Sequence, residues 1–180
     1  MKKFLRFIWE VVKMVVISLA IVLPIRYFLI QPFYVKGASM EPNFHDKEYL
    51  IIDEISYRFK APERGDIIVF RYPRDPQEYF IKRVIGLPGE TVQIKDNSVY
   101  ISNSEYPTGF KLPEVYLPTG VPTVAYTEDT VKVGDKQYFV LGDNRQASKD
   151  SRSFGVVDKS YLVGRVFFRG WPLNKVEVFK

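Results

Sequence analysis

The pattern of apolar and polar positions changes near residue 30. Before that point, a basic start leads into an apolar stretch whose uncharged centre, residues 14–25, predicts a helix. After it, short apolar runs rich in Val, Ile, Phe and Tyr alternate with Gly and Pro. Runs of this kind predict β-strands joined by turns. We therefore expect one N-terminal helix followed by a mainly β domain.

The individual runs locate the expected strands. The run 67–70 is apolar throughout, which predicts a strand buried on both faces. Residues 102–130 are rich in Pro, Thr and Gly without periodicity, and we expect an elaborated loop there, within a β/loop region at about 90–137. The predicted strands are 33–35, 48–54, 67–70, 79–85, 91–95, 99–101, 136–141, 161–169 and 175–179.

The strand predicted at 79–85 carries an unusual lysine. Strict alternation puts Lys82 on the same face as Phe80 and Val84, and puts Ile81 and Arg83 on the other face. A lysine among apolar neighbours can lose its charge, because burial disfavours the ammonium form. Lys82 is therefore a candidate for an amine of low pKa, although a strand lysine that reaches solvent is the common alternative.

The segment 37–42, Gly-Ala-Ser-Met-Glu-Pro, places a hydroxyl on a turn just after the apolar stretch. A serine needs a neighbouring base before it can act as a nucleophile, and otherwise Ser39 is an ordinary turn residue. The chain has one histidine, His45, and no cysteine. The base would be either His45, whose usual place is the surface, or a lysine of depressed pKa. Zinc sites of the usual Cys and His types are excluded.

Charge argues against a nucleic-acid partner. The net charge is +5, and residues 1–30 hold five basic and one acidic side chain. The other 150 residues are nearly balanced, with 21 basic and 20 acidic side chains. A nucleic-acid binder carries its basic excess on the folded domain, so this distribution excludes that class.

The first thirty residues predict a membrane anchor. The uncharged centre is shorter than the roughly 20 residues of a spanning helix, but the segment 10–30 reaches that length if Glu10, Lys13 and Arg26 lie near its ends. Basic residues before the segment favour a cytoplasmic N-terminus. A cleaved signal peptide and a buried amphipathic helix are the alternatives. We expect residues 1–9 in the cytoplasm, 10–30 as a single transmembrane anchor and 31–180 as an extracytoplasmic domain.

Four stretches together resemble the bacterial type I signal peptidases, membrane-bound serine endopeptidases that remove signal peptides from exported preproteins. They are GASMEP at 37–42, RGDIIVF at 64–70, FIKRVIGLPG at 80–89 and GDNRQASKDSR at 142–152. The resemblance implies coiled antiparallel sheets around a Ser-Lys dyad, no cofactor, and cleavage after small residues of the Ala-x-Ala type. It implies signal peptides and membrane lipid as partners, and the export machinery indirectly.

The resemblance also implies roles for individual residues. Ser39 would be the nucleophile, with its backbone N–H as an oxyanion donor, and Lys82 the general base. A set of polar residues would support them: Ser148 by orienting the lysine amine, Asp150 and Arg152 as an ion pair, and Asp143 and Arg145 at the same corner.

Small residues in the substrate require shallow apolar pockets, and we expect Phe33, Val35, Ile81 and Val84 to line them. The chain departs from the family pattern at two positions. Gly37 stands where some members carry a hydroxyl that serves as second oxyanion donor, which is typical of the Gram-positive type and leaves that donor open. Asn43 replaces the usual Thr, and we expect it to cap or bond locally.

Two other classes compete with this interpretation. A self-cleaving repressor-type Ser-Lys peptidase would share the chemistry, but the predicted anchor and the balanced domain argue against it. A membrane-tethered β binding module would have no reason to keep both Ser39 and Lys82. Two tryptophans, Trp9 and Trp171, are expected at an interface or in the core.

Overall fold

The computed structural model describes residues 2–28 and 30–179. Residues 1, 29 and 180, which belong to the predicted cytoplasmic terminus, anchor and domain, lie outside the described residues. The elements in chain order are α1 (Lys2–Phe28), β1 (Ile30–Tyr34), β2 (Tyr49–Asp53), α2 (Ser56–Phe59), β3 (Ile67–Tyr72), β4 (Asp75–Gly86), β5 (Thr91–Lys95), β6 (Ser98–Ser102), β7 (Phe110–Lys111), β8 (Thr130–Lys132), β9 (Gln137–Leu141), α3 (Ser151–Phe154), β10 (Val157–Asp158), η1 (Lys159–Tyr161), β11 (Leu162–Trp171), η2 (Leu173–Lys175) and β12 (Glu177–Val178).

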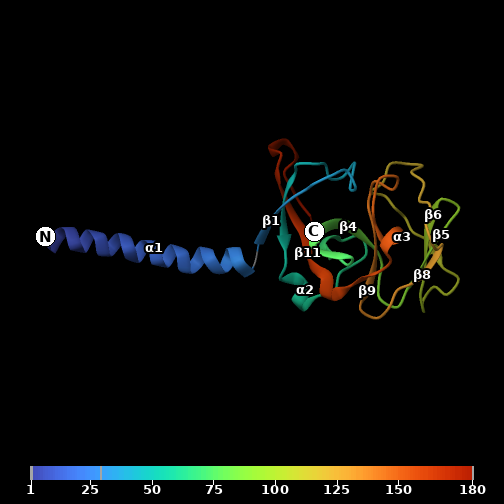
Figure 1. The fold of residues 1–180 in the computed structure, drawn as a ribbon, viewed down its shortest axis with the longest axis horizontal. Coiled ribbons are helices and arrows are strands. Elements are labelled where there is room, and N and C mark those ends of the chain that lie inside the picture. Colours follow the sequence, from blue (N-terminus) through green and yellow to red (C-terminus); the bar gives the residue numbers. More distant parts are fainter. Residues whose placement is uncertain (1, 29, 180) are drawn as a thin grey trace.

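Two antiparallel sheets form the domain (Figure 1). The larger has the strand order β1-β2-β11-β3-β4-β9-β10, with β12 paired to β11, and the smaller has the order β7-β6-β5-β8. In Figure 1 the smaller sheet lies at the end of the molecule opposite α1. The prediction of a mainly β fold with antiparallel sheets is confirmed.

The long strand β4 lies between β3 and β9 and thereby brings distant segments together. Lys82 lies opposite Ile68 of β3, and Arg83 lies opposite both Ile67 of β3 and Leu141 of β9. β3 is buried at five of its six positions, as its unbroken apolar run predicts. The middle of β4 is therefore covered by neighbours on both edges, and its side chains project into enclosed surroundings.

The predicted hairpin at 91–101 is formed by β5 and β6. Its two connecting residues, Asp96 and Asn97, have φ values of 50° and 58°. Two consecutive left-handed residues are the geometry of the tight turns that fit the twist of paired strands, and Asp and Asn tolerate it well. The turn residues thus set the register of this hairpin, in which Thr91 lies opposite Ser102.

Three apolar clusters fill the domain. One lies under the Ser39 turn and contains Met40, Phe44 and Ile52. A second packs β3, β4 and β9 together around Phe70 and Val140. The third joins the two sheets, with members from β4, β9, β5 and β6: Ile85, Leu141, Val92 and Ile101 among them. The smaller sheet is therefore fixed to the larger one through an apolar core.

The predicted N-terminal helix is present as α1, which projects away from the sheets (Figure 1). Its large apolar side chains from Phe4 to Leu23 are exposed. Within the described residues, no helix combines the length and the apolar character needed to cross a membrane. The prediction of a helix is confirmed, and that of a crossing at 10–30 is not.

The segment predicted as an elaborated loop, 102–130, contains little regular structure besides β7. The sequence did not predict the four-residue helices α2 and α3. α3 begins after Asp150, whose carboxylate accepts from the backbone N–H of Arg152 as an N-cap. A single helical turn is too short to show a period in the sequence, so its cap is the only local signal.

Candidate active site

Ser39 lies in the turn after β1, and this turn is fixed on both sides of the serine. Gly37 has a φ of 88°, which residues with a Cβ rarely adopt, and its N–H donates to Oδ1 of Asp46 at 2.8 Å. After the serine, Met40 and Phe44 are buried in the cluster beneath. Ser39 is thus half-buried on a backbone whose path is set before and after it.

Lys82 comes from the middle of β4 and meets this turn. Its Nζ lies 2.7 Å from Oγ of Ser39 and 2.8 Å from the carbonyl oxygen of Ile81. The residue is 3% exposed, and its Nζ lies 5.2 Å from the centroid of the Phe80 ring. The structure therefore brings together the two residues to which the sequence assigned the chemistry, within hydrogen-bonding distance.

Burial controls the protonation of Lys82. Removal from water lowers the pKa of Lys82 from its usual 10.5 to about 8, and attraction by the carboxylates of Asp150 and Asp143 limits the drop. Both carboxylates are paired with arginines and not with the lysine. An amine with a pKa near 8 is neutral in about a tenth of molecules at pH 7, and a neutral amine can accept the proton of the serine hydroxyl.

The loop after β9 closes against the nucleophile turn. Asn144 donates from its backbone N–H to the carbonyl oxygen of Ser39 at 3.1 Å, and from Nδ2 to that of Ala38 at 3.0 Å. A Cβ at Gly142 would clash with the Ser39 carbonyl oxygen and with Oγ of Ser148. The glycine therefore allows the two segments to pack backbone against backbone.

Ser148 lies beside this contact, with its hydroxyl buried. Within the described chain its Oγ has no hydrogen-bond partner, so no hydrogen bond joins it to Lys82. The Ser148 hydroxyl is thus an unused hydrogen-bond donor and acceptor beside the nucleophile turn. Leaving a buried hydroxyl unpaired lowers the stability of the fold by on the order of 1–3 kcal/mol. The orienting role of Ser148 stays a prediction.

Asp150 and Arg152 form a buried ion pair. Nε and Nη2 of Arg152 donate to the two carboxylate oxygens of Asp150, each at 2.8 Å. The same carboxylate accepts from the backbone N–H of Gly142 at 3.1 Å. Asp150 thus holds both ends of the loop, as the resemblance implied for this pair.

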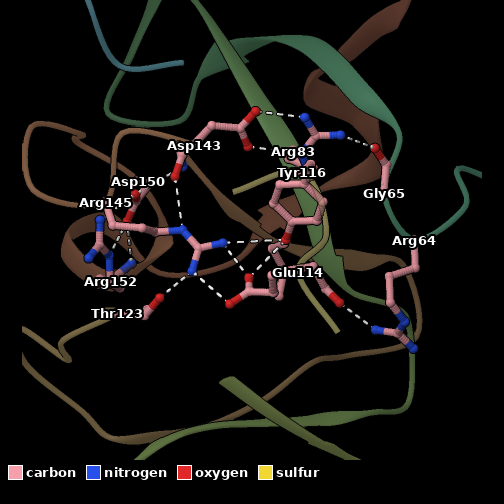
Figure 2. A network of polar contacts seen from close by, with 12 residues as sticks. Arg64, Gly65, Arg83, Glu114, Tyr116, Thr123, Asp143, Arg145, Asp150 and Arg152 are labelled. Carbon is pink, nitrogen blue, oxygen red and sulfur yellow. Dashed lines mark hydrogen bonds and ion pairs between the residues drawn. The ribbon is translucent and has the colours of Figure 1, made fainter. Parts of the chain in front are cut away.

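Asp143 and Arg145 were expected at the same corner, and each has a different partner (Figure 2). Asp143 accepts from Nε and Nη2 of Arg83 at 2.8 and 2.6 Å. It also accepts from Nδ2 of Asn43 at 2.8 Å. Because Arg83 follows Lys82 and Asn43 lies four residues after the serine, Asp143 joins the segments that carry both residues of the dyad.

The guanidinium of Arg145 is fully buried and held by the long loop. It forms an ion pair with Glu114 and donates to the hydroxyl of Thr123 (Figure 2). Its Nε donates to the carbonyl oxygen of Gly142 at 3.1 Å. Arg145 therefore connects the loop after β9 with the segment predicted as an elaborated loop.

A cleft of about 640 Å³ opens beside Ser39 and Lys82. Polar side chains at its walls include Lys36, Glu78 and Lys149. Its apolar lining is formed by Phe33, Val35, Leu50, Val69, Phe80 and Ile81. The cleft therefore offers apolar surface next to the hydroxyl, as small substrate side chains require.

Three of the four predicted pocket residues line this cleft, and the prediction for Val84 is corrected. Val84 is 0% exposed and packs in the core with Phe70 and Tyr138. Although it shares a strand face with Lys82, its side chain is enclosed by the apolar cluster that β3, β4 and β9 form, and so it does not reach the cleft.

His45 does not approach the serine. Its Nδ1 lies 3.6 Å from Oε1 of Glu41, and both side chains are partly exposed. It does not line the cleft. Among the described residues, no group of three or more His, Cys, Asp or Glu side chains could hold a metal ion.

The backbone N–H of Ser39 has no acceptor within the described ranges, 2–28 and 30–179. It is therefore free to donate to a substrate oxygen. Gly37 has no hydroxyl, and its N–H is already bonded to Asp46. Because residue 37 is a glycine and offers no hydroxyl, the Ser39 backbone N–H is the one oxyanion donor identified among the described residues.

Sequence reasoning missed several of these partners. Asn43 was expected to bond locally, but it bonds to Asp143 and to the carbonyl oxygen of Tyr116, both far along the chain. Arg83 lies in the recognised stretch 80–89, but its pairing with Asp143 was not predicted. The available signal was the alternation of the strand, which places Arg83 on the face opposite Lys82. Glu114 and Tyr116 lie in a segment without periodicity, where no signal pointed to them.

The sequence of residues 8–171 matches the model of a protein family described as signal peptidase, peptidase S26. A probable signal peptidase I-2 of Synechocystis is 40% identical over 173 residues, covering 93% of this chain and 75% of that protein. Signal peptidase I of Bacillus licheniformis is 38% identical over 177 residues, covering 94% and 91%.

Signal peptidase IB of Staphylococcus aureus is 31% identical over 175 residues, covering 89% of this chain and 90% of that protein. A crystal structure of a signal peptidase I from Enterococcus faecalis aligns with 59% of this chain and 97% of its own, at 38% identity and a TM-score of 0.48. The family model and the three sequence relatives span most of the chain. The chain therefore belongs to the signal peptidase family, peptidase S26, whose members are serine peptidases.

Proposed function

We propose that this protein is a type I signal peptidase, which cuts signal peptides from exported preproteins after small residues through a Ser39–Lys82 dyad. The observation that carries the proposal is the 2.7 Å separation of Oγ of Ser39 and Nζ of Lys82 at a lysine that is 3% exposed. A base must lie within hydrogen-bonding distance of the proton it takes and be neutral at the working pH. The separation of the two atoms meets the first condition, and the lowered pKa of Lys82, about 8, makes the neutral amine accessible near neutral pH.

The reaction begins when the neutral amine of Lys82 takes the proton of Ser39 and the oxygen attacks the scissile carbonyl. The carbonyl oxygen becomes an oxyanion, and the backbone N–H of Ser39 donates to it. Removing one such donor typically costs about 100- to 1000-fold in rate. The ammonium then protonates the leaving amine, so the mature protein departs and the signal peptide remains as an ester on Ser39.

Deacylation uses the same two residues. Lys82, neutral again after giving up its proton, takes a proton from a water molecule that attacks the ester. Collapse of the second tetrahedral intermediate returns the proton to Oγ of Ser39 and releases the signal peptide. The buried hydroxyl of Ser148 is available beside the nucleophile turn to orient the amine during these transfers.

Substrate selection follows from the cleft. Phe33, Val35 and Ile81 lie on its apolar wall next to the dyad, which supports a preference for small apolar side chains before the cut. Leu50 and Val69, which also line the cleft, are buried core residues. A preprotein with Phe at both selected positions that is cut at the same rate would contradict this specificity.

We further propose that α1 attaches the enzyme to the cell membrane, with the catalytic domain on the outer side. Exposed apolar side chains along the helix, such as Phe7, Trp9 and Ile17, support attachment. Basic residues at its start, Lys2 and Lys3, favour a cytoplasmic N-terminus. Fractionation of cells would recover the protein with membranes, and protease added to intact spheroplasts would digest the domain. Recovery in the soluble fraction would instead favour a repressor-type peptidase.

The test is cleavage of a fluorogenic signal-peptide substrate, in detergent, by the full chain and its variants. We expect cutting after Ala-x-Ala by the parent, and background rates for Ser39→Ala and Lys82→Met. His45→Ala should keep the parent rate, and Lys111→Met, a change at an exposed lysine of β7, is the matched control. If Lys82→Met keeps its rate, the base is misassigned. An inert parent would favour a binding module.

A further inference from the structure

The segment 112–127, here called the covering loop, lies against the polar side of the site and has no part in the proposed chemistry. Residues of this loop contact Arg83, Arg145 and Arg152. Figure 2 shows Tyr116 beside Arg83 and Glu114 paired with Arg145. Arg152, for example, lies 4.3 Å from the centroid of the Tyr126 ring and donates to the carbonyl oxygen of Val124 at 3.3 Å. One residue of the loop, Tyr116, contacts each of the three segments that build the site.

The backbone of Tyr116 is bonded to the nucleophile segment. Its carbonyl oxygen accepts from Nδ2 of Asn43 at 2.8 Å. Asn43 is four residues beyond Ser39, and Phe44 next to it is fully buried. The bond therefore ties the end of the nucleophile turn to the covering loop.

The ring of Tyr116 covers the strand that carries the base. The guanidinium carbon of Arg83 lies 4.0 Å from the ring centroid. Arg83 is next to Lys82 and pairs in a bidentate manner with Asp143. A guanidinium stacked on an aromatic face gains a favourable contact, and its planar group loses freedom to turn. The ring thus holds β4 at the residue beside the lysine.

The hydroxyl of Tyr116 reaches the third segment. It donates to Oε1 of Glu114 at 2.8 Å and accepts from Nη2 of Arg145 at 3.3 Å. Arg145 in turn bonds to the carbonyl oxygen of Gly142, which packs against the backbone of Ser39. The carbonyl, the ring and the hydroxyl of Tyr116 therefore contact three different segments: the nucleophile turn, β4 and the loop after β9.

We propose that Tyr116 is a positioning residue that fixes the distance between Ser39 and Lys82 by joining these three segments. It does not line the cleft, so it has no direct contact with a bound peptide there. Misplacement of reacting groups by about 1 Å can cost on the order of 100-fold in rate. Loss of Tyr116 should therefore slow the chemical step without weakening substrate binding. This inference rests on the proposed peptidase function.

The experiment compares Tyr116→Leu and Tyr116→Phe with Tyr100→Leu, a matched change at a half-buried tyrosine of the smaller sheet. The full chain is assayed in detergent with the Ala-x-Ala peptide, and kcat and KM are measured separately. We expect kcat of Tyr116→Leu to fall about 10- to 100-fold with KM within about twofold. Tyr116→Phe keeps the ring and loses only the hydroxyl link, so its kcat should fall several-fold, less than in Tyr116→Leu. Tyr100→Leu should match the parent.

A second measurement reads the geometry without turnover. In NMR spectra of lysine-labelled protein, the side-chain signal of Lys82, assigned from Lys82→Met, should move in Tyr116→Leu and stay in place in Tyr100→Leu. If the parent cuts no peptide, the proposed function fails, and this signal alone decides the positioning role.

Several results would overturn the inference. They are an unchanged kcat in folded Tyr116→Leu, a rise in KM alone, a loss that Tyr100→Leu shares, or a Lys82 signal that does not move. If Tyr116→Leu does not fold, Tyr116→Phe and Asn43→Ala decide the question. Each removes one of the three links, so each should lower kcat several-fold at constant KM, and parent-like kcat in both rejects the proposal.

Discussion

Lys82 and Arg83 are neighbours on β4, and both are buried, with 3% and 8% of their surface exposed. They face different surroundings. The lysine points toward the cleft, with the Ser39 hydroxyl and a backbone carbonyl as its hydrogen-bond partners. The arginine points toward the polar side and donates to both carboxylate oxygens of Asp143. Two adjacent buried cations thus differ in whether a carboxylate accompanies them.

The difference shows how one strand can carry a base and a scaffold side by side. A buried cation without a paired carboxylate is disfavoured, so the lysine tends to give up its proton. A buried cation with a bidentate partner keeps its charge, and arginine cannot be deprotonated in proteins in any case. We therefore assign the proton transfer to Lys82 and the fixing of β4 to the ion pair of Arg83. The following changes test that division, from the largest expected effect to the smallest.

Replacing Lys82 by arginine would make the two sites alike. An arginine at this position keeps a cation near Ser39 but cannot act as a base, so we expect kcat/KM to fall by roughly 100- to 10,000-fold. Initial rates with the Ala-x-Ala peptide measure this. Activity within tenfold of the parent would mean that a positive charge, and not a neutral amine, is what the serine needs.

Removing the arginine should cost stability. Arg83→Leu leaves the carboxylate of Asp143 buried without its partner, and breaking a buried pair costs about 3–5 kcal/mol. Guanidinium unfolding followed by tryptophan fluorescence would measure the loss. The double variant Arg83→Leu/Asp143→Leu removes both charges and should regain part of it. Equal stability of Arg83→Leu and the parent would show that the pair does not hold β4.

Removing the lysine should increase the free energy of unfolding, whereas removing the arginine lowers it. The pKa of Lys82 is about 8 in the folded chain and near 10.5 when unfolded, so folding at pH 7 is opposed by up to about 3 kcal/mol. The unfolded chain binds more protons between these two values, and stability therefore rises with pH across that window. Lys82→Met should be more stable than the parent below pH 8, with a gap that closes by about pH 10.5. If the stability difference between Lys82→Met and the parent does not change with pH, the difference comes from side-chain packing and not from the lowered pKa of Lys82.

The smallest effect concerns the supporting carboxylates. Asp150 raises the pKa of Lys82 by Coulomb attraction. Asp150→Asn should therefore lower the pKa of Lys82 and move the acid limb of the kcat/KM profile to lower pH. The variant must be compared at matched folded fraction, because its buried partner Arg152 loses its charge pair. A shift to higher pH would contradict the stated origin of the lysine's pKa.

The sequence predicted the longer strands, the hairpin at Asp96-Asn97 and the meeting of Ser39 with Lys82, because these rest on alternation, turn chemistry and motifs that local sequence carries. The short strands β7, β8 and β10 were not predicted. The sequence did not predict which residues surround the strand and the site in the folded domain. Val84 shares a face with Lys82, but only the tertiary packing shows that Val84 is enclosed in the core.

The polar side of the site depends on contacts between residues far apart in sequence. Asn43 bonds to residues 73 and 100 positions away, and Glu114 meets Arg145 from a segment that has no periodic pattern. Such partners are chosen by the tertiary fold, so no local signal identifies them. The N-terminal helix illustrates the same limit, since its helical pattern was readable while its relation to a membrane was not.

The most direct test of the account is an NMR titration of the lysine side chains in the full chain, in detergent, with Lys82→Met to assign the signal. We predict one lysine signal that titrates near pH 8 and is absent in Lys82→Met. The acid limb of the kcat/KM profile should follow the same pKa. A Lys82 signal that titrates near the ordinary lysine value of 10.5 would show that burial does not lower the pKa of this amine, and the dyad as described would be rejected.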